Sequence, residues 1–543
     1  MTAKRVAAPD GEGRSFNYLQ STAPGCVVIP ARSDEVRTAA DAVARAAEVV
    51  ERPNPVRRIG AAQLDAAKQL LMRTARQQLA LARDAMLQAA PAGLPGLPQG
   101  TEAHAGAAVQ AALAIVWNAL GELETLRGDA DAAVAAYRSA IALAPDDVFA
   151  HAQLAEVFES RHDVAAAMMH ARKALRGDPT HAAAGIALAR CLLREGSYAD
   201  AEGAALAATK ARHAEADEQA LAWTLAGEAR DRMDNARAAF ESFNQANRLM
   251  RQRYGDATQR GHPAHPANVR ALTNIVETSS AAAWRGASTH ATPAPAFLIG
   301  FPRSGTTLIE QALSSHPEIV CLGETEHLFE ALSMVLKDGD LFARIGALTV
   351  TEIETIRAAY RDIVRADHPD AAGRLVVDKH PLHITILPLI HKVFPDAKIV
   401  LAGRDPRDVV LSCYQQCFGV NVATMQFWDL RRAADYYDAV MGLLAACREK
   451  FHLDLLEMDY RDVVADFEGE MRRLAAFLGL PFAPAMLRYQ ETARRRTVTS
   501  ASARQVIQPI YASSLQRWRR YARELAPVLP LLNAWARRLG YEV

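Results

Sequence analysis

The stretch Pro295-Ala-Phe-Leu-Ile-Gly-Phe-Pro-Arg-Ser-Gly-Thr-Thr-Leu-Ile-Glu-Gln311 decides the fold of the region that contains it. Its first half is a short apolar run that predicts a β-strand, and a helix is expected to open near Thr306. Between them lies a tight turn, Gly300-Phe-Pro-Arg-Ser-Gly-Thr-Thr307, with the spacing of a phosphate-binding loop. In such a loop, backbone N–H groups and a helix N-terminus face an anion. The stretch therefore predicts a strand, loop and helix that bind phosphate, although a corner without a ligand has the same local pattern.

The charged residue of this loop narrows the class of ligand. A nucleoside triphosphatase carries a lysine after the second glycine, and Thr306 stands at that position here. The positive charge lies inside the loop instead, at Arg303. This difference disfavours a nucleoside triphosphatase and favours another phosphate-bearing donor, with a P-loop kinase of unusual form left as an alternative.

Length and composition set the outer limits of the prediction. A chain of 543 residues is expected to form two or three domains. Lys+Arg and Asp+Glu are both 62, and this balance argues against a general nucleic-acid binder. Six cysteines do not make a disulfide framework in a chain of this size. Neither a signal peptide nor an apolar run of about 18 residues is apparent, so we expect a cytoplasmic protein outside the membrane.

The pattern along the chain predicts four segments. Residues 1–30 read as a disordered tail, 31–255 as an α-helical repeat domain, 256–293 as a linker, and 294–543 as an α/β domain with a parallel sheet.

The repeat has a period of 34 residues, which separates Pro145 from Pro179. Trp117-Asn-Ala-Leu-Gly121 and the residues after it resemble a tetratricopeptide unit. The repeats, over about residues 105–250, are expected to be separable from the α/β domain and to offer a concave face to a peptide or partner. A spacer or dimerisation platform without a specific ligand is the alternative.

A second anion site is predicted at the end of another strand. The strand Lys398–Ala402 runs into Gly403-Arg-Asp-Pro-Arg-Asp408, and a helix follows. Arg404 would emerge at the same sheet edge as the phosphate loop, and Ser412 would lie two helical turns along. A guanidinium fork with a hydroxyl suits a phosphate monoester. The alternative is a surface salt bridge between Arg404 and Asp405.

Together the two motifs carry a family resemblance. Pro302-Arg-Ser-Gly-Thr-Thr307 and Arg404-Asp-Pro-Arg-Asp-Val-Val-Leu-Ser412 resemble the donor-binding motifs of sulfotransferases, which use 3′-phosphoadenosine 5′-phosphosulfate. The likeness is strongest to the tyrosylprotein sulfotransferases and to bacterial proteins that join tetratricopeptide repeats to this domain. It implies that the 3′-phosphate is held by Arg404 and Ser412. It also implies that the 5′-phosphosulfate is held by Arg303, Ser304, Gly305, Thr306 and Thr307.

Further segments extend the resemblance over about residues 294–520. Gly323-Glu-Thr325 is similar to the segment of the catalytic carboxylate, which implies that role for Glu324, and Asp378-Lys-His-Pro381 is similar to the catalytic-lysine segment. Met458-Asp-Tyr460 resembles a segment whose tyrosine lies near the nucleotide. The run from Ser502 to Trp518 resembles a C-terminal loop that closes over the donor, with Ser502 and Arg517 as its contacts. The implied catalytic set is Glu324, Arg303, Lys379 and Ser502.

Departures from the family pattern bear on the acceptor. Gln416 replaces an arginine of the second motif, and Glu326 occupies a position that is basic in the tyrosylprotein enzymes. An acidic residue there disfavours acidic peptides. Alternative readings of Glu324 are that it caps the next helix, or that a histidine replaces it as the base; the candidates are His316, His380 and His383.

The sequence thus predicts transfer of a sulfuryl group to a hydroxyl acceptor, without a metal. Protein tyrosine, a sugar hydroxyl and a small phenol all remain open as acceptors. A repeat-based interaction protein that binds nucleotide without turnover is a further alternative. A homodimer through the repeat faces or Trp518 is also left open.

Overall fold

The described residues of the computed structural model form two compact units, Met1–Ala214 and Glu215–Val543. The predicted tail, 1–30, and the segment up to residue 100 lie outside the described residues. The described ranges are 101–212, 214–255, 262, 264–284, 294–336, 344–495 and 515–543. None of the helices in these ranges combines the length and apolarity that a membrane span requires.

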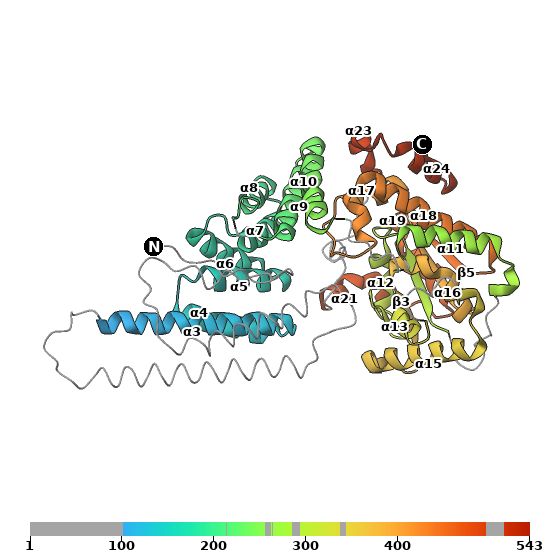
Figure 1. The fold of residues 1–543 in the computed structure, drawn as a ribbon, viewed down its shortest axis with the longest axis horizontal. Helices are drawn as coiled ribbons and strands as arrows, with labels where there is room; N and C mark the ends of the chain where they lie inside the picture. Colours follow the sequence, from blue (N-terminus) through green and yellow to red (C-terminus); the bar gives the residue numbers. More distant parts are fainter. Residues whose placement is uncertain are drawn as a thin grey trace, which may run out of the picture. The chain divides into compact units, whose positions relative to one another are not determined.

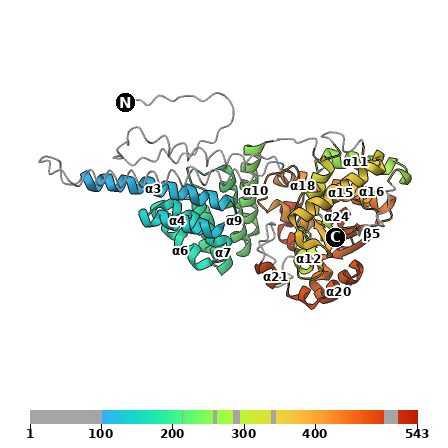
Figure 2. The same cartoon turned by 90° about the horizontal axis from the view of Figure 1, so that it is seen from below.

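The first unit is a series of helical hairpins (Figures 1 and 2). Its helices are α3 (Thr101–Leu126), α4 (Ala130–Leu143), α5 (Val148–Ser160), α6 (Val164–Gly177), α7 (Ala182–Glu195) and α8 (Tyr198–Ala208). The second helices of the hairpins, α4, α6 and α8, begin at intervals of 34 residues. Ala133, Ala167 and Ala201 recur at the same step and are fully buried, because a small side chain lets paired helices approach closely. The helical character of this region is confirmed, and its tetratricopeptide class stays a prediction.

The next hairpin, α9 (Ala216–Arg232) with α10 (Ala236–Tyr254), belongs to the second unit. The boundary between the two compact units therefore lies at residue 214, whereas the sequence predicted a domain boundary at residue 255. The helical periodicity is the same on both sides of residue 214, so the sequence pattern gives no sign of the change in packing partner.

The predicted linker also contains core structure. Helix α11 (Pro266–Thr278) packs on α18 (Leu430–Lys450), with Val269, Leu272 and Val276 fully buried. These three positions lie on one face of a helix, and burying them fixes α11 to the domain. The sequence predicts a helix around Asn268–Ala282 within this segment, and the Gly, His and Pro residues around it indicate a linker.

A parallel sheet of five strands is the centre of the second unit. The strands are β1 (Ala296–Gly300), β2 (Ile319–Cys321), β3 (Leu375–Lys379), β4 (Lys398–Gly403) and β5 (Asp454–Asp459). Their order is β2-β3-β1-β4-β5, and all five residues of β1 are buried. The predicted parallel α/β sheet is confirmed. Because the order reverses between β1 and β4, the loops after these two strands leave the sheet side by side, where such sheets bind ligands.

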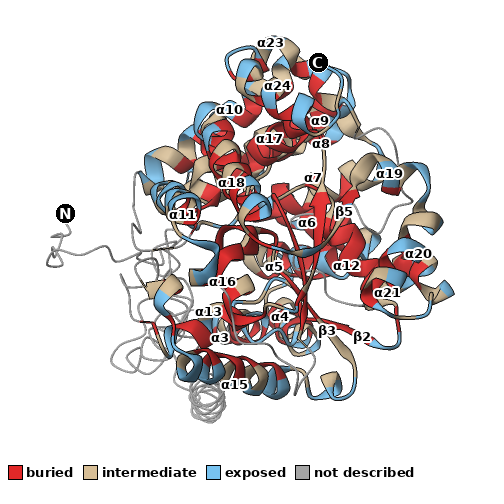
Figure 3. Ribbon diagram, turned by 90° about the vertical axis from the view of Figure 1, so that its right-hand side faces the viewer, coloured by how far each residue is buried: buried red, intermediate tan, exposed pale blue. Residues whose placement is uncertain are grey.

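Helices cover both faces of the sheet (Figure 1). Ala296 and Leu298 of β1 face a core shared with α12 (Thr306–Ser314), α20 (Phe467–Leu478) and α21 (Tyr489–Arg495). Phe297 and Ile299 face the other core, shared with α15 (Val350–Asp367), α16 (Leu387–Val393), α17 (Pro406–Tyr414) and α18. Figure 3 shows buried residues along the strands and exposed residues on the outer side of α15.

Shorter elements complete the second unit. They are α13 (His327–Ser333), α19 (Tyr460–Ala465), α23 (Ala522–Leu525), α24 (Leu529–Arg538), and the 3-10 turns η2 (Ala281–Trp284), η3 (Ile345–Ala347), η4 (Pro369–Ala371), η5 (Pro381–Ile386), η6 (Thr424–Trp428), η7 (Pro484–Arg488) and η9 (Arg517–Tyr521).

Candidate active site

The predicted phosphate loop connects β1 to α12, which begins at Thr306 as expected. Gly305 has φ +105°, a conformation that a residue with a side chain rarely adopts. A Cβ on Gly305 would also lie 2.9 Å from Cδ2 of Tyr460. The loop is tied internally by the Ser304 hydroxyl, which donates to the carbonyl of Phe301 at 2.7 Å. Its backbone is therefore fixed with the start of α12 directly behind it.

Arg303 and Arg404 meet at the switch point of the sheet. Arg303 Nε donates to Ser412 Oγ at 3.0 Å, and Arg404 Nη1 donates to the carbonyl of Arg303 at 3.1 Å. The guanidinium carbon of Arg404 also lies 5.0 Å from the centroid of the Tyr460 ring. Loop, strand end and helix thus bring two guanidinium groups and a hydroxyl together, as the sequence predicted.

Asp405, the partner in the alternative salt bridge of Arg404, is bound by Arg407. Asp405 caps α17 by accepting from the N–H of Arg407, and it binds the guanidinium of Arg407 at 2.7 Å. Arg404 therefore retains its place beside the loop. Cys413, on the same helix, is buried with its thiol 3.4 Å from the carbonyl of Pro302.

A buried lysine forms the second part of the site. Lys379, at the end of β3, is 1% exposed, and its Nζ lies 2.5 Å from Glu324 Oε1 and 3.0 Å from Glu310 Oε2. The Glu324 side chain is 38% exposed, whereas that of Glu310 is 10% exposed. The N-cap of α13 is Glu326, so Glu324 does not cap that helix. The Lys379 ammonium is therefore paired with a mostly buried carboxylate, Glu310, and with a partly exposed one, Glu324.

Sequence reasoning missed Glu310. It lies on α12, one turn after Thr306, among residues that are otherwise buried and mostly apolar. A buried carboxylate requires a cationic partner, and this requirement is the signal that could have identified it. Its ion pair joins Lys379 to the helix that follows the phosphate loop.

A buried network lies beneath Lys379. Tyr360 of α15 donates to Asp378 Oδ2 at 2.9 Å, and His383 Nδ1 lies 3.5 Å from Asp378 Oδ1. Burial raises the pKa of Asp378 to about 7 and lowers the pKa of His383 well below its ordinary value. Asp378 therefore titrates near neutral pH, whereas His383 stays neutral there.

The other candidate histidines differ in position. Burial also lowers the pKa of His380, whose Nε2 lies 3.7 Å from Glu326 Oε1. His380 therefore neighbours the exposed carboxylates and stays an alternative base. His316 is hydrogen bonded to the carbonyl of Pro481 at 2.8 Å, a contact that holds two loops together.

The sequence predicts that Ser502 and Arg517 of the C-terminal loop contact the donor. Ser502 lies outside the described residues. Arg517 forms an ion pair with Asp231 of α9 at 2.5 Å, so its contact with a donor stays a prediction. Trp518 is 9% exposed beneath the guanidinium of Arg407, at 4.1 Å, and is therefore not a surface for a dimer partner.

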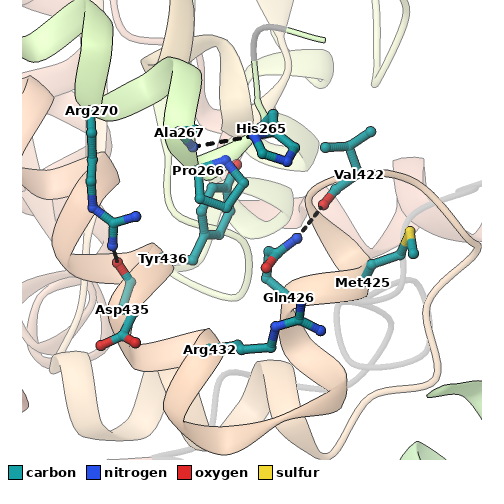
Figure 4. A pocket seen from close by; sticks show the side chains of 10 residues that line it. All are labelled: His265, Pro266, Ala267, Arg270, Val422, Met425, Gln426, Arg432, Asp435 and Tyr436. Atoms are coloured by element: carbon teal, nitrogen blue, oxygen red, sulfur yellow. Dashed lines mark hydrogen bonds between the residues drawn. The ribbon is translucent and has the colours of Figure 1, made fainter. Parts of the chain in front are cut away.

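Two cavities of the second unit lie apart from these residues. One, of about 340 Å³, is drawn in Figure 4. The ring of Tyr436, which lines it, also packs on Phe301 of the phosphate loop, with ring centroids 5.9 Å apart. A second cavity, of about 540 Å³, lies along α15 and the start of β3. The predicted donor-site residues line neither cavity. The first is lined by His265, Pro266, Ala267, Arg270, Val422, Met425, Gln426, Arg432, Asp435 and Tyr436.

Comparison with known proteins finds a family similarity in the second unit. Residues 295–484 match the family model described as the sulfotransferase family. The match includes β1 to β5, the phosphate loop and the Lys379 cluster. The resemblance found in the sequence is thus confirmed for residues 295–484 and remains untested for the helical repeats.

Relatives are similar to slightly less than half of the chain. An uncharacterized protein of Aquifex aeolicus is 32% identical over 257 residues, which cover 46% of this chain and 34% of that protein. Protein-tyrosine sulfotransferase A of Caenorhabditis elegans is 28% identical over 261 residues, covering 45% of this chain and 67% of that protein. Human protein-tyrosine sulfotransferase 1 is 26% identical over 265 residues, covering 45% and 69%. The chain therefore spans about one third of the Aquifex protein and two thirds of the other two.

Solved structures were also found. The sulfotransferase domain from the curacin biosynthetic pathway has a TM-score of 0.30 and 19% identity, covering 46% of this chain and 100% of that chain. Sulfotransferase STF9 from Mycobacterium avium has a TM-score of 0.31 and 17% identity, covering 64% and 97%.

Proposed function

We propose that this protein transfers a sulfuryl group from 3′-phosphoadenosine 5′-phosphosulfate to a hydroxyl acceptor. The observation that carries the proposal is the meeting of two elements at one sheet edge. An anion site of Arg303, Arg404 and Ser412 follows β1 and β4, and the Lys379–Glu324 pair follows the neighbouring strand β3. The anion site suits a bisphosphorylated donor. The Lys379–Glu324 pair suits proton acceptance and charge stabilisation at a reacting oxygen.

The proposed binding of the co-substrate relies on hydrogen-bonding groups that the fold holds in fixed positions. The N–H groups of the loop and the first turn of α12 are oriented toward an anion. Arg404 presents a guanidinium fork, which binds phosphate more specifically than a lysine would. Its stacking on Tyr460 holds the fork in one orientation. An aromatic ring at this position also offers a face to a nucleobase.

The transfer step conserves charge and atoms without a redox partner. The acceptor oxygen forms a bond to sulfur while the bond between sulfur and the bridging oxygen of the 5′-phosphate breaks. The acceptor proton passes to the carboxylate of Glu324, and the charge that develops on the bridging oxygen is stabilised by Lys379 and Arg303. Glu310 keeps the Lys379 ammonium in place during this step.

Two partly exposed side chains beside Lys379 and His380 are negatively charged. The side chains of Glu324 and Glu326 are 38% and 53% exposed, whereas the ammonium of Lys379 is buried. This arrangement supports an acceptor whose surroundings are neutral or cationic. Two tyrosine peptides of equal length, one flanked by lysines and one by glutamates, test it. A higher kcat/KM for the glutamate-flanked peptide would contradict this part of the proposal.

The helical hairpins of the first unit are proposed to recruit the acceptor or another partner. Their buried alanines favour close stacking, and stacked hairpins of this kind leave an extended face for binding. Truncation of residues 1–214, the first compact unit, tests this role. We expect activity on a small phenol to be retained and activity on a macromolecular acceptor to be lost.

Isothermal titration of the full chain tests the donor. We expect adenosine 3′,5′-bisphosphate to bind in the micromolar range and ATP not to bind. Binding of ATP in preference to the bisphosphate would favour the kinase alternative. Bisphosphate binding without sulfuryl transfer to any of a phenol, a peptide and a sugar would favour a nucleotide-binding interaction protein.

A further inference from the structure

A buried carboxylate on the last turn of α9 organises the C-terminal segment of the chain. Asp231 is 4% exposed, and its oxygens lie 2.5 Å from Arg517 Nη2 and 3.3 Å from Arg520 Nη1. It also accepts a hydrogen bond of 2.5 Å from the hydroxyl of Tyr521. A carboxylate in the C-terminal turn of a helix is unfavourable with respect to the helix dipole. Partners from a distant segment must compensate, and Asp231 therefore fixes η9 to α9.

Helix α17 holds the same segment from its other side. Asp408 is 2% exposed and accepts from the backbone N–H groups of Gln516 and Trp518, both at 2.8 Å. The guanidinium of Arg407 lies over the Trp518 ring. Asp408 also interacts electrostatically with Arg404, the predicted phosphate ligand. The segment 516–521 is thus held between a carboxylate of α9 and a carboxylate of α17.

Helix α10 holds the far end of α17. Asn247 Nδ2 donates to the carbonyl of Tyr414 at 2.9 Å, and the Tyr414 hydroxyl donates to Asn244. Phe240 stacks on Tyr414, with ring centroids 5.3 Å apart. Tyr414 follows Ser412 by two residues, so these contacts bear on the helix that carries a donor-site hydroxyl. The α9–α10 hairpin therefore supports α17 both directly and through η9.

We infer that Asp231 is a positioning residue of the donor site. It acts through η9 and Asp408 on the orientation of α17, and hence on Arg404 and Ser412. The inference rests on the proposed function, because it assumes that these two residues bind the donor. It makes the α9–α10 hairpin part of the transferase itself. A chain that begins near residue 290 would lose bisphosphate binding, in contrast to the separable repeat region expected from the sequence.

The test compares two substitutions in the full chain. Asp231→Asn removes the buried charge. Asp234→Asn is its matched control, because the Asp234 side chain is 91% exposed and its ion pair is with Arg520. Affinity for adenosine 3′,5′-bisphosphate is measured by isothermal titration below the melting temperature of each variant. We expect Asp231→Asn to bind about tenfold more weakly and Asp234→Asn to bind as the wild type does.

Further readouts separate positioning from stability. KM for the donor should rise in Asp231→Asn while kcat at saturating donor is retained, and Asp231→Glu should recover part of the affinity. If Asp231→Asn does not fold, Tyr521→Phe removes one hydrogen bond to the same carboxylate and should weaken binding by a smaller factor. Wild-type affinity in a folded Asp231→Asn or Tyr521→Phe protein, with only a lower melting temperature, would overturn the inference. Failure of the wild type to bind the bisphosphate would instead contradict the proposed donor, and the inference would fall with it.

Discussion

Replacing Glu324 by glutamine separates its chemical role from its structural one. Lys379 keeps its contact with Glu310 at 3.0 Å, and the Glu324 side chain is 38% exposed, so the fold loses only a partly solvated ion pair. We expect the free energy of unfolding to fall by less than about 1 kcal/mol. Loss of the proton acceptor should lower kcat by about 10²–10⁴-fold. That range corresponds to about 2.7–5.4 kcal/mol in the activation barrier.

The assay follows transfer of labelled sulfuryl groups from the donor to a phenol and to a tyrosine peptide. Bisphosphate affinity is measured alongside it and should stay within about twofold of the wild type, because Arg303 and Arg404 are untouched. Glu318→Gln serves as the matched control, since it makes the same change at an exposed position beside β2. A Glu324→Gln enzyme with wild-type kcat would refute the assignment. His380, beside the exposed carboxylates, would then be tested next by His380→Gln.

Three further predictions concern the loop, the donor fork and the buried network. Arg404→Ala should cost about 1.5–3 kcal/mol in bisphosphate binding by titration, because a charge-assisted hydrogen bond is lost; unchanged affinity would contradict the phosphate role. Gly305→Ala should cost about 1–3 kcal/mol in unfolding free energy, because φ is +105° and the methyl group would meet Tyr460; a variant as stable as the wild type in urea would contradict the strain. Burial raises the pKa of Asp378 from 3.8 to about 7, so the folded protein keeps a proton that the unfolded chain releases. Asp378 therefore makes stability fall as pH rises from about 4 to about 7, by at most about 1.4 kcal/mol per pH unit, and the difference between wild type and Asp378→Asn in urea unfolding at several pH values should show this slope. A pH-independent difference would contradict it.

Several features of the second unit depend only on residues that are adjacent in the sequence. The strand before Gly300, the loop and the start of α12 at Thr306 were all predicted, because a short apolar run, two glycines and a helix N-terminus impose one arrangement on adjacent residues. The meeting of Arg303 with Arg404 was also predictable. Both follow parallel strands, and the carboxyl ends of such strands share one edge.

The boundary between the two compact units was harder to predict from the sequence. Hairpin α9–α10 continues the helical pattern of the preceding hairpins but belongs to the compact unit that contains the sheet. Ala239 and Phe243 of α10 join the main core of that unit, and Asp231 and Asn247 add polar contacts to it. These polar side chains have no distinctive spacing along the chain. Helix α11 was placed in a linker for a related reason, since its buried face is short and its neighbours in sequence are Gly, His and Pro.

The sequence by itself determined the two strands that end at Gly300 and Gly403, the loop after the first of them, and the residue types of the proposed donor and proton-transfer sites. Only the tertiary structure decided how their charges are compensated. Glu310 reaches Lys379, Asp231 reaches Arg517, and Asp378 meets Tyr360 because buried charged and polar groups must find partners wherever the fold brings elements together. Local spacing specifies the conformation of neighbouring residues, whereas the pairing of residues far apart in sequence depends on the packing of the whole unit.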